Sequence, residues 1–142
     1  MDLQAAISSI MSTDLKTAKA SDPVAVVNEY FNEFRIHHVP VIDEENEVVG
    51  IISKSDFLYL LRGYTVSDVD TYLREAKLRS FKVEEIMSKD VVTLSASGSI
   101  KDAVGILSEN RFRCLPILDD NNHLVGIVTP NDILHFINQE IG

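Results

Sequence analysis

The sequence predicts an α+β fold made of two copies of one strand–helix–strand–strand–helix unit. Residues 50–56 read Gly-Ile-Ile-Ser-Lys-Ser-Asp, and residues 126–132 repeat that order as Gly-Ile-Val-Thr-Pro-Asn-Asp. When these two stretches are aligned, the alignment extends without a gap over residues 10–58 and residues 86–134. Two copies are too few for a solenoid. We therefore expect the two repeats to pack on each other as a pseudo-twofold pair.

Composition limits the class of protein. Of the 142 residues 45% are hydrophobic, and each half alone would bury little surface, which favours obligate pairing of the halves. The net charge of −9 argues against a nucleic-acid partner. The single cysteine, Cys114, permits no internal disulfide. Residues 1–4 include no basic residue, so we expect no signal peptide. No apolar run reaches the roughly 20 residues of a membrane helix, so we expect a cytoplasmic protein without a membrane partner.

The first copy opens with apolar residues at helical spacing over residues 2–11, which predict a short amphipathic helix. Residues 15–18 are expected to form a short strand. The triplet Ser-Asp-Pro at 21–23 predicts the start of the next helix, with a capping side chain and then a proline. The buried face of that helix is predicted from apolar residues at three- and four-residue steps: Val24, Val27, Phe31 and Phe34.

A hairpin and a second helix complete this copy. Residues 38–42 predict a strand, in which Pro40 favours an edge position or a strand start. The polar turn at 43–46 and a strand at 47–52 predict the hairpin. Ser53 then opens a helix.

Residues 62–82 have no counterpart in the repeat. We divide the chain into a first repeat at 1–62, a partly helical linker at 63–82 and a second repeat at 83–142. Within the linker, residues 67–70 predict a helix start. Tyr72, Leu73, Ala76 and Arg79 lie where an exposed connecting helix would place them, and we expect only partial burial of that helix. The second repeat is expected to follow the first, with strands at 91–94, 114–118 and 123–128 and helices at 99–110 and 130–139.

The repeated motif at 50–56 and 126–132 has two interpretations. Ser53 and Thr129 have the spacing of helix N-caps, with Asp56 and Asp132 as first-turn acids. The same geometry predicts a nucleotide site: free N–H groups at a helix start bind phosphate, a carboxylate accepts from a ribose diol, and glycine permits close approach of a ligand. The residues alone leave both interpretations open.

The chain resembles the CBS-domain (cystathionine β-synthase domain) family, paired as a Bateman module. The resemblance covers nearly the whole chain and rests on three repeated motifs. They are Ile-Met-Ser at 10–12 and 86–88, a proline-containing strand ending in aspartate at 39–43 and 115–119, and the glycine-to-aspartate stretch at 49–56 and 125–132.

The resemblance implies two clefts between the repeats that bind an adenosine nucleotide (AMP, ADP, ATP or S-adenosylmethionine). In each cleft an aspartate, Asp56 or Asp132, would hold the ribose, with Ser53 or Thr129 beside it. Thr17 and Thr93 would line the base pocket, just after the first strand of each repeat. Residues that reach the phosphate from the opposite repeat would be His37, His38 and Arg113.

This chain departs from the family pattern at several positions. The second repeat has an acid-alanine pair at Asp102 and Ala103 where the first has two valines, so the two clefts are not equivalent. Ala20 and Ala96 stand where the family often has proline, and Cys114 offers no charge beside Arg113. A cleft that contains His37 and His38 would bind an anion in a pH-dependent way. Adjacent residues on a strand point to opposite faces, so the sequence predicts no metal site at these histidines.

The most concrete prediction is a stand-alone regulatory module, not an enzyme, because no nucleophile or Walker-type loop accompanies the two aspartates. We expect it to need no obligatory cofactor and to bind only the nucleotide ligand. The expected partners are a second copy, side by side in a flat disc, and an unknown effector protein. The alternative is a dimeric interaction scaffold whose clefts bind no ligand.

Overall fold

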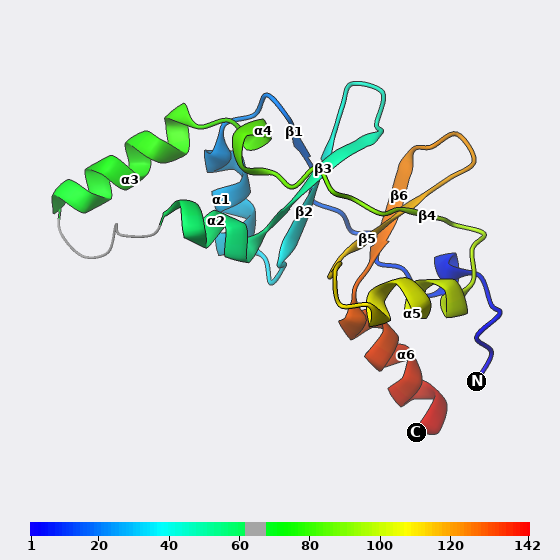
Figure 1. Cartoon of the computed structure of the whole chain (residues 1–142). Coiled ribbons are helices and arrows are strands. Elements are labelled where there is room, and N and C mark those ends of the chain that lie inside the picture. Colours follow the sequence, from blue (N-terminus) through cyan, green and yellow to red (C-terminus); the bar gives the residue numbers. More distant parts are fainter. Residues whose placement is uncertain (62–67) are drawn as a thin grey trace. The chain divides into compact units, whose positions relative to one another are not determined.

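The computed structural model describes residues 1–61 and 68–142, although the side chains of 68–71 are not described (Figure 1). The elements of the first half are η1 (Ile7–Ser9), β1 (Ala18–Lys19), α1 (Val24–Glu33), β2 (His38–Ile42), β3 (Val48–Ser53), α2 (Lys54–Leu60) and α3 (Asp68–Ser80). Those of the second half are α4 (Val83–Ile86), β4 (Leu94–Ser95), α5 (Ile100–Ser108), β5 (Leu115–Leu118), β6 (Leu124–Val128) and α6 (Pro130–Ile141).

Each repeat forms one small three-stranded sheet, in the order β1-β2-β3 or β4-β5-β6. The first strand of each sheet pairs parallel with the second, and the second pairs antiparallel with the third. Both hairpins carry a register irregularity at the same repeat position, Val41/Ile42 in one and Ile117/Leu118 in the other. The predicted α+β fold and the strand–helix–strand–strand–helix order are confirmed.

The chain divides into two compact units whose limits differ from those of the sequence repeats. One unit consists of residues 16–90, and the other of residues 1–15 together with 91–142. A stretch near the start of each repeat, 5–12 or 81–88, therefore packs on the sheet of the other repeat. We call these two stretches the leading segments. Ser12 bridges Ile127 of β6, and Ser88 bridges Ile51 of β3.

The leading segments also fill the two hydrophobic cores. Ile7 and Val83 occupy equivalent repeat positions, and both side chains are fully buried. The core of residues 16–90 contains Ala18, Val24, Val27, Phe31, Val39, Val41, Ile52, Phe57, Leu61, Leu78 and Val83. The other core contains Ile7, Ile100, Ala103, Leu107, Leu115, Ile117 and Val128. Each core is thus completed by a residue that the sequence places beside the opposite repeat.

The repeated glycines make room for the leading segments. A Cβ added at Gly50 would lie 2.5 Å from Sδ of Met87 and 2.9 Å from the carbonyl oxygen of Ser88. A Cβ at Gly126 would collide with Sδ of Met11. The sequence interpretation assigned these glycines to the approach of a ligand. The structure places a methionine side chain there instead.

Two expectations about the first helices were wrong. Residues 2–11 form only the turn η1, because their backbone pairs with residues 98–101: Ile7 N–H donates to the Gly98 carbonyl at 2.7 Å and Ile100 N–H to the Ala5 carbonyl at 3.0 Å. Phe34 is not core; α1 ends at Glu33, and the Phe34 ring is 40% exposed, with Lys16 Nζ 4.3 Å from its centre.

The start of α1 and the strands also differ from the expectation. Pro23 is the N-cap of α1, and Asp22 instead accepts from the Lys19 N–H at 2.8 Å. Pro40 lies in the central strand of its sheet, where it is tolerated next to a very short neighbour: β1 pairs only with the two residues after Pro40, Val41 and Ile42. The strands β1 and β4 contain only two residues each, and both begin three residues later than expected.

The connecting helix α3 agrees with the expectation of partial burial. Tyr72 and Leu73 are exposed, and Leu78 is buried. The predicted helix start at 67–70 lies partly outside the described residues. No helix within the described parts of the chain has both the length and the apolar character needed to cross a membrane.

Candidate functional site

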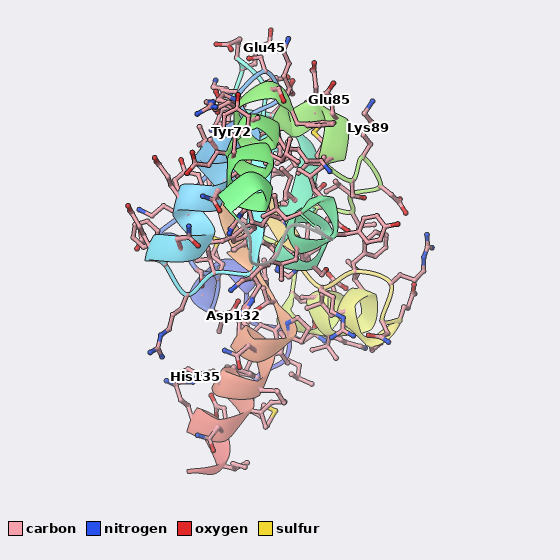
Figure 2. All side chains as sticks on the ribbon, turned by 90° about the vertical axis from the view of Figure 1, so that its left-hand side faces the viewer. Glu45, Tyr72, Glu85, Lys89, Asp132 and His135 are labelled. Carbon is pink, nitrogen blue, oxygen red and sulfur yellow. The ribbon has the colours of Figure 1, made fainter. Side chains whose placement is uncertain are left out.

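Asp132 lies at the start of α6 and is already bonded to its own helix cap (Figure 2). Its Oδ2 accepts from the Thr129 N–H at 2.9 Å and from Thr129 Oγ1 at 3.2 Å. Its Oδ1 accepts a long hydrogen bond of 3.5 Å from the Ser12 hydroxyl of the leading segment. The capping interpretation therefore holds for the second copy of the motif.

Asp56 occupies the equivalent place in the first copy but its carboxylate is differently engaged. Ser53 is the N-cap of α2, and its Oγ accepts from the Asp56 N–H at 3.1 Å. Ser53 Oγ also shares a hydrogen bond of 3.0 Å with Ser55 Oγ. Within the described residues, the Asp56 carboxylate accepts no hydrogen bond, and the residue is exposed. Asp56 is thus open to a ligand, whereas Asp132 is committed to a cap.

The two threonines of the expected base pocket sit just before the short strands, not just after them. Thr17 precedes β1, and its carbonyl accepts from the Tyr30 hydroxyl at 2.9 Å. Thr93 precedes β4 and is exposed. The positional reason given for these residues was therefore wrong, because the strands start later than the sequence pattern suggested.

His37 and His38 lie next to the Ser53 cap of their own unit. The Lys54 N–H donates to the His37 carbonyl at 2.8 Å, and His38 pairs with Ser53 in the β2–β3 register. His37 is exposed and His38 half-buried. In residues 16–90, the structure thus brings His37, His38, Ser53 and Asp56 to one end of the β2–β3 hairpin.

Arg113 and Cys114 occupy the corresponding place before β5. Arg113 is exposed, and Cys114 is 4% exposed. Burial, and then the negative charge of Asp132, raise the pKa of the Cys114 thiol to about 12. Cys114 is therefore a neutral, enclosed thiol beside Asp132. Arg113, Cys114, Thr129 and Asp132 all belong to the unit formed by residues 1–15 and 91–142.

Among the described residues, an acidic cluster lies at the turn of the first hairpin. Carboxylate oxygens of Asp43, Glu45 and Glu47 at the β2–β3 turn come within 4.8 Å of one another. Asp43 Oδ1 already accepts from the Glu45 N–H at 2.9 Å and from the Glu47 N–H at 3.0 Å. This arrangement is explained by the turn itself, as is the equivalent Asp119, which accepts from the Asn121 and His123 N–H groups.

Sequence reasoning missed two residues of this region. Ser12 contacts Asp132. Met11 packs on Gly126 of β6, the strand that precedes Asp132. The available signal was the repeated Ile-Met-Ser at 10–12 and 86–88, which was used only to mark the start of each repeat. A repeated polar residue in such a signature is a candidate contact for the repeated acid.

A family model described as "CBS domain" matches this chain twice, over residues 7–63 and 83–139. The chain belongs to the CBS domain family. Its two matches make it a tandem CBS pair, or Bateman module, as the sequence resemblance predicted.

Relatives of this CBS pair include both short proteins and parts of large enzymes. An uncharacterised 17.7 kDa protein of Acidianus ambivalens is 31% identical over 127 residues, 89% of this chain and 70% of that protein. Inosine-5'-monophosphate dehydrogenase of Thermoplasma acidophilum is 30% identical over 125 residues. This match covers 88% of the CBS pair, which spans only 22% of the enzyme.

A solved structure with the same fold contains a nucleotide. The CBS-pair protein CBSX2, in complex with AMP, superposes with a TM-score of 0.77 at 25% sequence identity. The superposition covers 97% of this chain and 99% of that chain. CBSX2 without the ligand is described as a protein of Arabidopsis thaliana.

Proposed function

We propose that this CBS pair is a regulatory module that binds an adenosine nucleotide, with AMP as the first candidate. The observation that carries the proposal is the likeness to CBSX2 in complex with AMP, which extends over nearly the whole of both chains. ADP, ATP and S-adenosylmethionine share the adenosine group and are the further candidates. The module is not an enzyme: its two aspartates serve as ribose ligands and helix caps.

In this proposal Asp56 accepts hydrogen bonds from the ribose hydroxyls, with Ser53 beside it. The support is the exposed Asp56 carboxylate, which has no hydrogen-bond partner among the described residues. A ribose diol that binds there breaks no hydrogen bond to the Asp56 carboxylate among the described residues. A carboxylate that accepts two hydroxyl hydrogen bonds recognises the sugar without contributing to binding of the base.

The second site, at Asp132 and Thr129, binds more weakly. A ribose can reach Asp132 Oδ2 only in competition with the N–H and hydroxyl of Thr129. Loss of a hydrogen bond to a charged group costs about 1.5–3 kcal/mol. Thr17 and Thr93 are proposed to line the adenine pockets, and His37, His38 and Arg113 to reach the phosphate.

The test is calorimetric titration of AMP into the wild-type protein and three single variants. Asp56→Asn should weaken binding about 10- to 100-fold, which follows from losing a charged hydrogen-bond acceptor. Asp132→Asn should have a smaller effect on affinity. Its amide oxygen can still accept from the Thr129 N–H, so the stability should fall by only about 0.3–1 kcal/mol, through loss of the negative charge at the start of α6. Asp120→Asn, an exposed acid of the hairpin turn, is the matched control. Unchanged AMP affinity in Asp56→Asn would contradict the assignment.

The ligand identity is tested by thermal shift. At about 100 times its dissociation constant, a ligand that binds only the folded state stabilises it by roughly 2.7 kcal/mol. For a chain of this size that raises the Tm by several degrees. AMP, ADP, ATP and S-adenosylmethionine are compared in parallel. No shift with any of the four would favour the ligand-free scaffold over the nucleotide sensor.

The proposed partners are a second copy of the chain and an effector protein. Leu58 of α2 and Leu134 of α6 occupy equivalent repeat positions and are 54% and 64% exposed. Tyr59 and Ile141 are also largely exposed on these two helices. Apolar helix faces of this kind support pairing with a second copy. A nucleotide then acts by its differential affinity for two arrangements of the repeats.

A further inference from the structure

Two of the chain's three methionines occupy equivalent positions in the leading segments. Met11 lies beside Gly126 of β6, and Met87 lies beside Gly50 of β3. Each of these methionines belongs to the same compact unit as its glycine. The third methionine, Met1, is 60% exposed and belongs to neither leading segment. The repeated pair therefore lies where each leading segment meets a strand of its own unit.

The sulfur atoms of this pair lie close to the backbone of the glycines. Sδ of Met87 is only 2.5 Å from the point that a Cβ of Gly50 would occupy. Cγ of Met11 is 2.7 Å from the corresponding point at Gly126, and Sδ of Met11 is closer still. An atom added to either sulfur on the side of the strand would therefore collide with that strand.

Both side chains pack on a core and still reach solvent. Met11 packs on the core of residues 1–15 and 91–142, and Met87 packs on the core of residues 16–90. Both residues are half-buried, so a small solute can reach part of each side chain. Oxidation of a thioether gives a sulfoxide, which is polar and chiral. Such a polar group at the edge of a core is unfavourable unless its oxygen accepts a hydrogen bond.

Each methionine is followed directly by the serine that attaches its leading segment to the strand. Ser12 and Ile127 exchange backbone hydrogen bonds of 2.9 and 3.0 Å. Ser88 and Ile51 exchange backbone hydrogen bonds of 2.8 and 2.9 Å. A methionine that moves away from its glycine displaces the backbone of the next residue. The state of the sulfur is thus linked to the attachment of the leading segment.

We propose that Met11 and Met87 are a pair of reversible oxidation sites whose sulfoxides loosen the leading segments from β6 and β3. The oxidant is hydrogen peroxide. Its O–O bond breaks as the sulfur gives up two electrons; one oxygen atom forms the S–O bond, and the other leaves as water with both hydrogens. Methionine sulfoxide reductases restore the thioether, while a dithiol is oxidised to a disulfide and the oxygen leaves as water.

The other sulfur of the chain is protected from this reaction. Cys114 is the single cysteine, and it is 4% exposed. Burial, and then the charge of Asp132, raise the pKa of its thiol to about 12. At neutral pH this thiol is therefore not in the ionised form that reacts with oxidants. Peroxide acts on the methionines and leaves Cys114 reduced.

The test is a time course of the full chain in hydrogen peroxide at neutral pH, without nucleotide. Tandem mass spectrometry gives the sulfoxide content of each methionine, and a thermal melt gives the Tm at each time. Met1 should be oxidised first because it is the most exposed. The Tm should fall by several degrees only as Met11 and Met87 are oxidised. Methionine sulfoxide reductases A and B together should restore the Tm.

Variants that cannot be oxidised assign the effect to the individual sites. Met11→Leu/Met87→Leu keeps apolar side chains of similar volume, and peroxide should leave its Tm unchanged. The matched control, Met1→Leu, should show the same fall in Tm as the wild type. Met11→Leu or Met87→Leu alone should keep part of the fall, because the two sites lie in different units. An equal fall in the double variant would overturn the proposal.

Hydrogen exchange measured by NMR tests where the protein loosens. In the oxidised wild type, exchange should become about tenfold faster at the amides of the two bridges, since local opening sets their exchange rates. These are the amides of Ser12, Ile51, Ser88 and Ile127. The Asp119 amide, which donates within the second hairpin turn, is the internal control and should change less.

Two further outcomes would also overturn the proposal. One is complete oxidation of Met11 and Met87 with an unchanged Tm and unchanged exchange at the bridges. The other is a folded chain in which both stay reduced after Met1 has been fully oxidised. If the double leucine variant fails to fold, the time course in the wild type decides. A Tm that falls with oxidation of Met1, and not with that of Met11 and Met87, then counts against these sites.

Discussion

Replacement of Gly126 by alanine tests the packing of the leading segment on β6. The new methyl group would meet three side-chain atoms of Met11: Sδ, Cγ at 2.7 Å and Cβ at 3.1 Å. Real Cβ atoms do not come this close to their neighbours, so Met11 must move. Its neighbour Ser12 exchanges backbone hydrogen bonds of 2.9 and 3.0 Å with Ile127, and a displaced Met11 strains that bridge.

The expected cost follows from overpacking. Extra atoms in a well-packed site typically cost about 1–3 kcal/mol. Alanine recovers part of that, about 0.4–1 kcal/mol, by restricting the unfolded chain. We therefore expect Gly126→Ala to lower the free energy of unfolding by about 1–2 kcal/mol. The Tm should fall by several degrees in a domain of this size.

Urea denaturation followed by circular dichroism measures this cost in a double-mutant cycle with Met11→Ala. Met11→Ala removes Sδ and Cγ, so the double variant should be more stable than the sum of the single effects by about 1 kcal/mol. In the first repeat Met87→Ala should rescue Gly50→Ala less well, because the Ser88 carbonyl oxygen stays 2.9 Å from the new methyl. Additive effects, or a stable Gly126→Ala that merely loses AMP affinity, would refute the packing argument.

Three further predictions concern the thiol, the helix faces and the hairpin turn. The Cys114 thiol, with its pKa raised to about 12, should resist iodoacetamide at pH 8 in the folded protein. Between pH 9 and 12 this thiol is protonated in the folded protein and ionised in the unfolded chain, so the free energy of unfolding should fall by about 1.4 kcal/mol per pH unit. Cys114→Ala should reduce that slope in pH-dependent denaturation. Leu134→Glu and Leu58→Glu should each shift the chain toward the monomer in sedimentation equilibrium. Asn131 is a polar residue that is also exposed, and Asn131→Glu should cause no such shift. An unchanged mass of both leucine variants would contradict the dimer. Asn122, at φ 64°, should tolerate glycine but lose about 1–2 kcal/mol on replacement by valine, and a stable valine variant in thermal melts would count against this strain.

The local elements could be predicted from the sequence because their signals are local. The hairpins combine β-branched strands with an Asp-to-Asn turn, and the positive φ angles at Asn46 and Asn122 match that turn chemistry. Likewise, the hydroxyl at Ser53 and the proline after Thr129 correctly located the starts of α2 and α6. Because the two repeats align without a gap, each element is also indicated twice in the sequence.

What could not be predicted depends on contacts between distant residues. Apolar spacing over residues 2–11 suggested a helix, but Ile7 is buried because its segment pairs with residues 98–101, some ninety positions away in the chain. Phe34 fits the helical period, yet α1 ends one residue earlier. A periodic pattern cannot indicate where a helix ends or which repeat covers an apolar residue.

The unequal engagement of the two aspartates was equally hidden. Asp56 and Asp132 follow their hydroxyl residues at the same spacing, so the sequence makes them equivalent. The difference comes from the orientation of each carboxylate: Asp132 turns back to Thr129, and Asp56 does not turn back to Ser53. The rotamer of a side chain at a helix start depends on its local contacts. The spacing of residues in the sequence does not indicate that rotamer.

The exchange of leading segments sets an order in which the protein can be completed during synthesis. Residues 16–90 form one continuous stretch, so that unit has all its parts once residue 90 has left the ribosome. Residues 1–15 emerge before this unit but belong with residues 91–142, which emerge after it. Ile7 and Met11 therefore stay without their packing partners until the second repeat has been synthesised, and a ribosome stalled within that repeat leaves residues 1–15 without their core.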